Sequence, residues 1–185
     1  MKRIPAITTL FLILAVSAAG AVDVDGKILP GEYAREQSFE KGSFRLLWRI
    51  VDDKIFMAID SDAKGWVSVG FEPTRIMANS DMIFGFVEAS GSVKAVDAWS
   101  TGIFGPHPPD VDQGGKDSIL SFAGTRSSNR VVFEFSRALD TGDKFDKPIP
   151  SSGSFKVIWA QSQSMGFTAK HNKAGSLTLD MGGSY

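Results

Sequence analysis

The stretch that decides the fold is residues 43–60, which read SFRLLWRIVDDKIFMAID. Apolar side chains occupy every second position on both sides of a polar turn at 52–54: Phe44, Leu46, Trp48 and Ile50 before it, and Ile55, Met57 and Ile59 after it. An apolar residue at every second position is the signature of a half-buried strand, whereas a helix would repeat every three or four residues. The stretch therefore predicts two strands joined by a turn, with their apolar faces turned to a core.

The same alternation extends outward along the chain. Further strands are predicted at 67–71, 82–89, 92–99, 117–122, 130–136, 154–163 and 175–181, separated by turns and by loops at 100–116 and 141–153. No window keeps a helical period for three turns, and residues 137–139 are predicted as one short helical turn. About nine short strands without a long helix indicate an all-β fold, an antiparallel β-sandwich. Their spread favours one domain over residues 22–185.

The segment Met82–Ala89 (MIFGFVEA) is apolar on both of its faces. Such a strand is either covered on both sides or lies beside a ligand pocket. Gly85 in its middle indicates the close approach of another backbone or of a ligand, because glycine weakens a strand and is otherwise unfavourable there.

Residues 1–21 have the features of a secretory signal peptide. Lys2 and Arg3 precede an apolar run at 7–16, and Ala19 and Ala21 have the A-x-A spacing of a cleavage site. The alternative is an uncleaved anchor, but the run is short for a bilayer span of roughly 20 residues. We therefore expect cleavage after Ala21 and an exported protein, periplasmic or secreted, with no membrane span after cleavage.

The composition excludes several classes of function. The 185 residues contain no cysteine, which rules out disulfides, cysteine-ligated zinc, iron–sulfur clusters, a cysteine nucleophile and covalently attached haem. Lys and Arg number 20 against 21 Asp and Glu, so no basic excess favours nucleic acid as a partner.

Residues that could carry catalysis are few. The only histidines are His107, in a proline-rich loop, and His171, and each by itself is most simply an ordinary loop residue. No nucleophile elbow, zinc-protease motif or phosphate-binding loop is present, so an enzyme is not expected. The paired carboxylates are interpreted as solvated turn residues, and calcium at the last pair lacks an EF-hand pattern: Asp52 and Asp53, Asp60 and Asp62, Asp110 and Asp112.

Several segments in a fixed order resemble the DOMON domain. They are 65–71 (GWVSVGF), 77–82 (MANSDM), 97–100 (DAWS), 109–110 (PD) and the closing stretch from 170–171 (KH) to 175–179 (GSLTL). Residues 25–26 (DG) and 31–33 (GEY) are similar to the start of related bacterial haem-binding members. The resemblance covers nearly all of the chain after residue 21.

The resemblance implies an immunoglobulin-like β-sandwich and a cofactor. DOMON members bind haem or are proposed to bind sugars, and in the haem-binding members one methionine and one histidine ligate a b-type haem, as in the cytochrome domain of cellobiose dehydrogenase. Those positions fall on Met77 and His171, which become the expected axial ligands of the iron. Arg75 and Lys170 are their neighbours and are candidates to pair with the propionates, and Phe84 is a candidate wall of the haem slot.

Two uncharged axial ligands raise the reduction potential of haem iron and leave no site for oxygen. The expected function is therefore electron transfer by non-covalent haem b, with a separate protein as redox partner. The main alternative is a haem-free module that binds a sugar or another small ligand, with tryptophans as stacking groups: Trp48, Trp66, Trp99 and Trp159. A sandwich that only binds a protein partner is a third possibility, and a self-contained enzyme is the least favoured.

Overall fold

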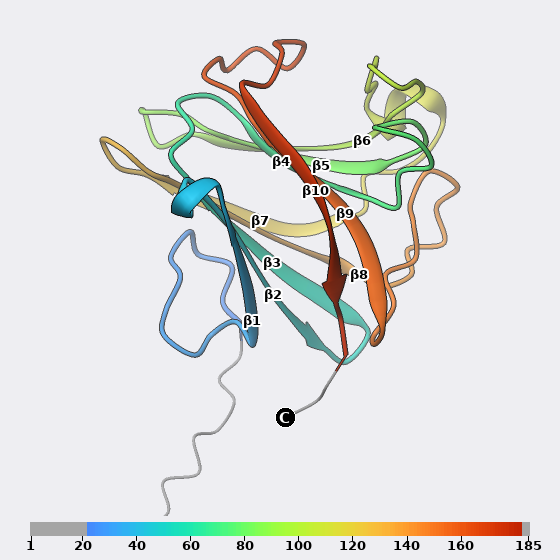
Figure 1. The fold of residues 1–185 in the computed structure, drawn as a ribbon, viewed down its shortest axis with the longest axis horizontal. Coiled ribbons are helices and arrows are strands. Elements are labelled where there is room, and N and C mark those ends of the chain that lie inside the picture. The colour runs from blue at the N-terminus through green and yellow to red at the C-terminus, as the bar shows by residue number, and fades with distance from the viewer. Residues whose placement is uncertain (1–21, 183–185) are drawn as a thin grey trace, which may run out of the picture.

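The computed structural model describes residues 22–182, so the predicted signal peptide at 1–21 lies outside the described residues. Two antiparallel sheets of five strands lie one above the other (Figure 1). One sheet has the order β1 (Arg35–Phe39), β2 (Phe44–Val51), β3 (Lys54–Ser61), β8 (Val131–Ala138) and β7 (Ile119–Arg126). The other has the order β10 (Lys173–Asp180), β9 (Ser154–Gln161), β4 (Val67–Phe71), β5 (Asp81–Val87) and β6 (Val93–Trp99). The predicted antiparallel β-sandwich is confirmed.

Helical structure within residues 22–182 is limited to two short 3₁₀ turns, η1 (Glu40–Gly42) and η2 (Asp110–Gln113). Neither is long and apolar enough to cross a membrane.

The stretch at 43–60 forms the hairpin β2–β3, with Trp48 opposite Met57 and the turn at Asp52 and Asp53. Its alternating apolar side chains point between the two sheets, where Phe44, Leu46, Met57 and Ile59 are fully buried, and this is the main core. Period-two alternation places an entire set of side chains on one face of a strand, so the pattern in the sequence and the burial in the structure agree.

Two details of the strand prediction were wrong. The chain at 137–138 continues strand β8 instead of forming a helical turn, because Arg137 pairs with Ile55 of β3 and takes its side chain into the interior. Strand β1 was missed because its sequence, REQSF, is mostly polar. It is the edge strand beside β2, where only a little of its surface needs to be buried.

Strand β5 is covered on both faces, as its sequence predicted. Ile83 and Val87 join the core between the sheets, whereas Met82, Phe84 and Phe86 belong to a second apolar cluster on the outer face. A Cβ atom added to Gly85 would lie 2.3 Å from the ring of Phe133 on β8. The close neighbour of Gly85 is thus a core side chain, and the expectation of a backbone or a ligand there is corrected.

The segment at 22–33 is fastened to the first sheet by Glu134 of β8. Its carboxylate accepts hydrogen bonds from the backbone N–H of Gly26 at 2.6 Å and from the hydroxyl of Tyr33 at 2.7 Å. Gly26 has a φ of 84°, and a Cβ atom there would lie 2.8 Å from the backbone of Gly124. The DG…GEY pattern is therefore explained by this docking, because only glycine tolerates both the positive φ and the close approach.

Candidate functional site

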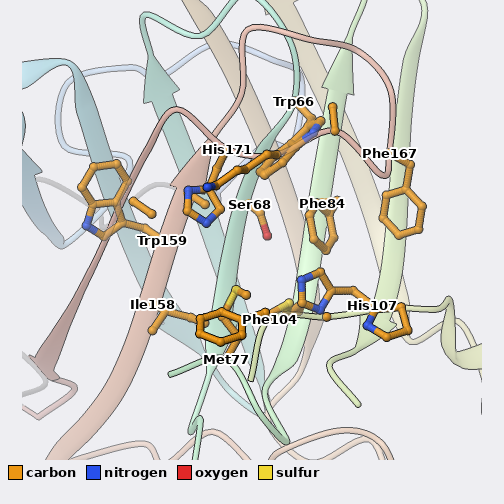
Figure 2. Close-up of a pocket in the computed structure, with 18 of the residues that line it drawn as sticks. Trp66, Ser68, Met77, Phe84, Phe104, His107, Ile158, Trp159, Phe167 and His171 are labelled. Carbon is orange, nitrogen blue, oxygen red and sulfur yellow. The ribbon is translucent and has the colours of Figure 1, made fainter. Parts of the chain in front are cut away.

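A cavity of about 1120 Å³ lies on the outer face of the second sheet (Figure 2). Small side chains of β4, β9 and β10 leave room on its floor: Ser68, Gly70, Ala160, Ala174 and Gly175. Its walls are mainly apolar, and the ring of Phe84 makes edge contacts with both Trp66 and Phe167. Ligand and cofactor sites usually enclose roughly 300–1,000 Å³ and are lined by apolar groups with a few polar ones, so the cavity lies just above the upper end of that size range and has a similar lining.

Met77 reaches the cavity from the turn between β4 and β5. This turn is fixed by its own hydrogen bond from the backbone N–H of Ala78 to the carbonyl oxygen of Arg75, at 2.9 Å, and by one from Asn79 to Ser100, also 2.9 Å. Ile76 has a φ of 55°, which a β-branched residue rarely adopts and which costs about 1–3 kcal/mol. The surrounding bonds hold this strained turn, and with it the position of Met77.

His171 reaches the same cavity from the loop between β9 and β10. Backbone contacts close this loop, among them the bond from the N–H of Asn172 to the carbonyl oxygen of Gln161 at 2.9 Å. Burial, and then the charge of Lys170, hold the pKa of the His171 imidazole below its ordinary value. The ring is therefore neutral at pH 7, which is the form that binds a metal.

Met77 and His171, 94 residues apart in the sequence, meet at one cavity. Figure 2 shows His171 and Trp66 toward one side of the pocket, Met77 and Phe104 toward the other, and Ser68 between them on the floor. Strand pairing brings them together, because β4, β5, β9 and β10 belong to one sheet and the loops at their ends cover its outer face.

His107 is a wall residue that the sequence interpretation missed. Its ring lies 6.1 Å from that of Phe84, and its buried Nδ1 has no hydrogen-bond partner among the described residues. Burial, and then the nearby His171, lower its pKa. The Nε1 of Trp66 is likewise buried without a partner. The available signal was the rigid stretch at 105–109 (GPHPP), which presents a histidine from a fixed loop.

The remaining predicted site residues occupy different positions. Phe84 is buried in the wall, and Lys170 is exposed at the rim. Arg75 is exposed and is not one of the residues that line the cavity. Phe104, which the sequence did not single out, also borders the cavity, although it is 76% exposed.

The paired carboxylates do not share one environment. Asp52 and Asp53 are exposed in a turn, as predicted. Asp60 lies in β3 and forms ion pairs with Arg45 and Arg130. Asp110 is fully buried, so its interpretation as a solvated turn residue was wrong.

The fold and site define an antiparallel β-sandwich domain with an apolar pocket on one outer face, bordered by a methionine and a histidine. The DOMON domain family matches residues 40–162, and the chain belongs to that family.

The chain is similar in sequence to one named relative and in fold to two solved structures. DBH-like monooxygenase protein 1 of Mus musculus is 30% identical over 151 residues, which are 82% of this chain and 22% of that protein. The chain thus spans about a fifth of that relative's length. The fold is similar to the cytochrome b domain of pyranose dehydrogenase from Coprinopsis cinerea, with a TM-score of 0.56, 15% identity and coverage of 78% and 80% of the two chains. The cytochrome domain of Myriococcum thermophilum cellobiose dehydrogenase gives a TM-score of 0.58, 11% identity and coverage of 80% and 82%.

Proposed function

We propose that this domain binds haem b without covalent attachment and carries electrons to or from a separate redox protein. The observation that supports this most directly is that Met77 and His171 border one apolar cavity from opposite sides (Figure 2). A thioether and a neutral imidazole are the uncharged ligand pair used for low-spin, electron-transferring haem.

The residues around the cavity fit such a cofactor. The walls supply aromatic surface for a flat apolar ring, and the buried Nε1 of Trp66 is a donor with no partner in the part of the chain that the structure describes. Lys170 at the rim provides a cation for a carboxylate that points to solvent. Met77 and His171 would hold the iron of such a haem, which would supply one-electron chemistry at a raised reduction potential.

The chain's own part is to bind, to orient and to exclude water. The hydrogen-bonded turn holds Met77 in place before any ligand arrives, and the closed loop does the same for His171. Phe84 and Trp66, both nearly fully buried, keep water from the cavity wall. A preorganised, dry site needs little rearrangement when charge changes.

The comparisons support a redox setting for the proposal. The mouse relative is named a monooxygenase, and the structural neighbours are cytochrome domains of dehydrogenases. We propose that the enzyme with which this domain exchanges electrons is a separate protein, and that the exchange takes place outside the cytoplasm, following the leader predicted at 1–21.

The sugar-binding hypothesis has less support. Stacking on a sugar needs an accessible tryptophan face, but Trp48, Trp66 and Trp159 are each 5% exposed or less. Trp99 is half-buried, with Phe145 at one side of it and the ammonium of Lys147 over its ring.

The test is haemin titration of the purified protein, followed by visible spectra of the oxidised and reduced forms. We expect one haem per chain and the sharp bands of a six-coordinate, low-spin iron. Met77→Leu and His171→Gln should each change these bands and weaken haem retention. The matched controls are Met82→Leu and His107→Gln, which alter a second methionine and the second histidine of the same cavity.

Two results would overturn the proposal in different ways. If the folded wild-type protein takes up no haem, the cofactor is wrong. If haem binds but both control variants, and neither ligand variant, change the low-spin spectrum, then Met82 and His107 are the ligands and the assignment to Met77 and His171 is wrong.

A further inference from the structure

A second unusual site lies inside the sandwich, away from the outer-face cavity. Asp81 begins β5 and Asp97 lies on the neighbouring strand β6, where Asp97 is opposite Ile83 and Asp81 is opposite Trp99. Residues opposite one another in a sheet share a face, so both carboxylates point to the same side as the core residue Ile83. The inner face of β5 and β6, which is otherwise apolar, therefore carries two acidic side chains at this end of the strands.

Three more charged side chains complete this cluster. Arg137 of β8 crosses from the other sheet, with its Nη1 2.7 Å from the Oδ2 of Asp81 and 3.8 Å from the Oδ1 of Asp146. Asp146 comes from the loop between β8 and β9, and Asp110 from the start of η2. All five residues are buried: Asp81, Asp110 and Arg137 are 0% exposed, Asp97 is 4% and Asp146 is 8%.

The charges in this acidic cluster (Asp81, Asp97, Asp110 and Asp146) are not balanced by the single guanidinium of Arg137. Within residues 22–182, five of the eight carboxylate oxygens are buried without a hydrogen-bond partner: the Oδ1 atoms of Asp81, Asp97 and Asp146, and both oxygens of Asp110. Burying a carboxylate without a partner is costly, and native proteins rarely leave such groups unsatisfied.

The nearby cations do not remedy this deficit. The ammonium of Lys147 lies 5.0 Å from the ring centre of Trp99, and that of Lys144 lies 4.7 Å from that of Phe145. Burial, and then the charge of Asp146, raise the pKa of Asp97 to about 8 and that of Asp110 to about 7. The cluster is therefore short of positive charge.

We infer that this acidic cluster is a binding site for a divalent cation, with calcium the best fit. Asp81, Asp97 and Asp146 each place one carboxylate oxygen within 4.8 Å of the others. Two oxygens that bind one Ca²⁺ at 2.3–2.6 Å are at most about 5 Å apart, so this spacing accommodates Ca²⁺. Mg²⁺ demands near-ideal octahedral geometry and usually keeps several waters, which suits a buried set of carboxylates less well. An all-oxygen set of several carboxylates favours a hard cation over zinc or copper.

The site would join parts of the chain that are far apart in sequence. Its acids come from β5, β6, the η2 turn and the loop between β8 and β9, and the two loops meet where Lys144 reaches the carbonyl oxygen of Gln113 at 3.5 Å. A bound cation would fasten both loops to the sandwich. The expected consequence is greater stability of the folded state, because binding only to the folded form raises the free energy of unfolding.

The experiment uses haem-free protein, so its result is independent of the proposed function. Protein treated with EDTA is titrated with CaCl₂ in a calorimeter, and its thermal unfolding is followed with and without Ca²⁺, with Mg²⁺ for comparison. We expect one Ca²⁺ per chain, a higher melting temperature with Ca²⁺ and weaker binding of Mg²⁺. Asp97→Asn and Asp146→Asn should each weaken Ca²⁺ binding at least about tenfold, since losing even an outer partner of a metal ligand has that effect.

The matched control is Asp112→Asn, which neutralises an exposed acid in the same short turn as Asp110. It should leave Ca²⁺ affinity unchanged. The inference is overturned if the wild-type protein shows neither heat of binding nor a change in melting temperature at millimolar Ca²⁺. It is also overturned if binding is as strong in the Asp97 and Asp146 variants as in the wild type.

Discussion

The two faces of strand β5 have opposite surroundings. On the inner face, Ile83 and Val87 are fully buried against the other sheet, and Gly85 has no room for a side chain beside Phe133. On the outer face, Met82 and Phe84 border a cavity of about 1120 Å³. Adjacent residues of one strand thus alternate between a close-packed core on one side and the wall of a cavity on the other.

The difference comes from what covers each face. The inner face meets a second sheet, whose regular side chains can fill the space between layers about 10 Å apart. The outer face meets loops, which are tied to one another by backbone hydrogen bonds such as that from Asn79 to Ser100 and leave space above the small residues of the floor. The inner face serves stability and the outer face leaves room for a ligand, and the following substitutions test that division.

The largest loss of stability is expected when the buried charge on the inner face is removed. Arg137→Met keeps most of the side-chain volume but removes the guanidinium that contacts Asp81, and breaking a buried ion pair costs about 3–5 kcal/mol. Urea unfolding measures the change. The control Arg45→Met removes a partly exposed arginine that pairs with Glu36 and Asp60, and should cost about 1 kcal/mol or less. Equal losses in the two variants would contradict this account.

A matched pair of methionines compares packing on the two sides. Met57 of β3 is 0% exposed in the main core, and Met57→Ala should cost about 2–5 kcal/mol. Met82→Ala should cost less, because one side of Met82 already faces the cavity and has fewer contacts to lose. Both values come from denaturant unfolding of the haem-free protein. If Met82→Ala is the more destabilising change, the outer face is not the looser one.

Alanine substitutions at two glycines, one on each side of the sheet, should give a third and smaller difference in stability. In Gly85→Ala the new methyl group would meet the ring of Phe133, which is held by the core, so a cost of about 1–3 kcal/mol is expected. In Gly70→Ala the new group would meet the side chains of Ser80 and Ile158, and Ile158 borders the cavity and can move into it. The melting temperature should therefore fall further for Gly85→Ala, and the reverse order would be inconsistent with a rigid inner face.

The smallest change in stability is expected at the rim of the cavity. Phe104 is 76% exposed, so Phe104→Ser should alter the free energy of unfolding by less than about 0.5 kcal/mol. On the proposed function it should nevertheless speed the transfer of haem to a scavenging protein, because it uncovers one side of the pocket beside Met77. A large loss of stability would show that Phe104 is part of the fold and not of the rim.

Much of the fold could be predicted because its signal is local. Alternation in 43–60 gave both strands and the buried face, and the two-sided apolar pattern at 82–89 indicated a strand with two covered faces. The edge strand at 35–39 was missed because it buries little. Arg137 was placed in a helical turn because three residues have no measurable period, and its pairing with Ile55 depends on a distant strand.

The candidate site was predicted less completely. Met77 and His171 were found through their resemblance to family positions, and the structure places both at one cavity. His107 was set aside because the sequence indicates a rigid proline-rich loop at 105–109 but not which part of the fold that loop covers. Asp81 and Asp97 were also missed as site residues. Both lie on the inner face of the sheet, at positions where an alternating strand would usually carry an apolar residue.

The sequence by itself determined the apolar strands, their inner and outer faces and the absence of cysteine chemistry, because each follows from residue type and from neighbours two positions away. The tertiary structure decided which loops meet over the second sheet, and hence that two residues 94 positions apart border one cavity. It also decided that four acids from separate elements are buried around one arginine, which forms ion pairs with Asp81 and Asp146. Both sites depend on sheet order and loop closure, which arise from contacts between segments that no local pattern specifies.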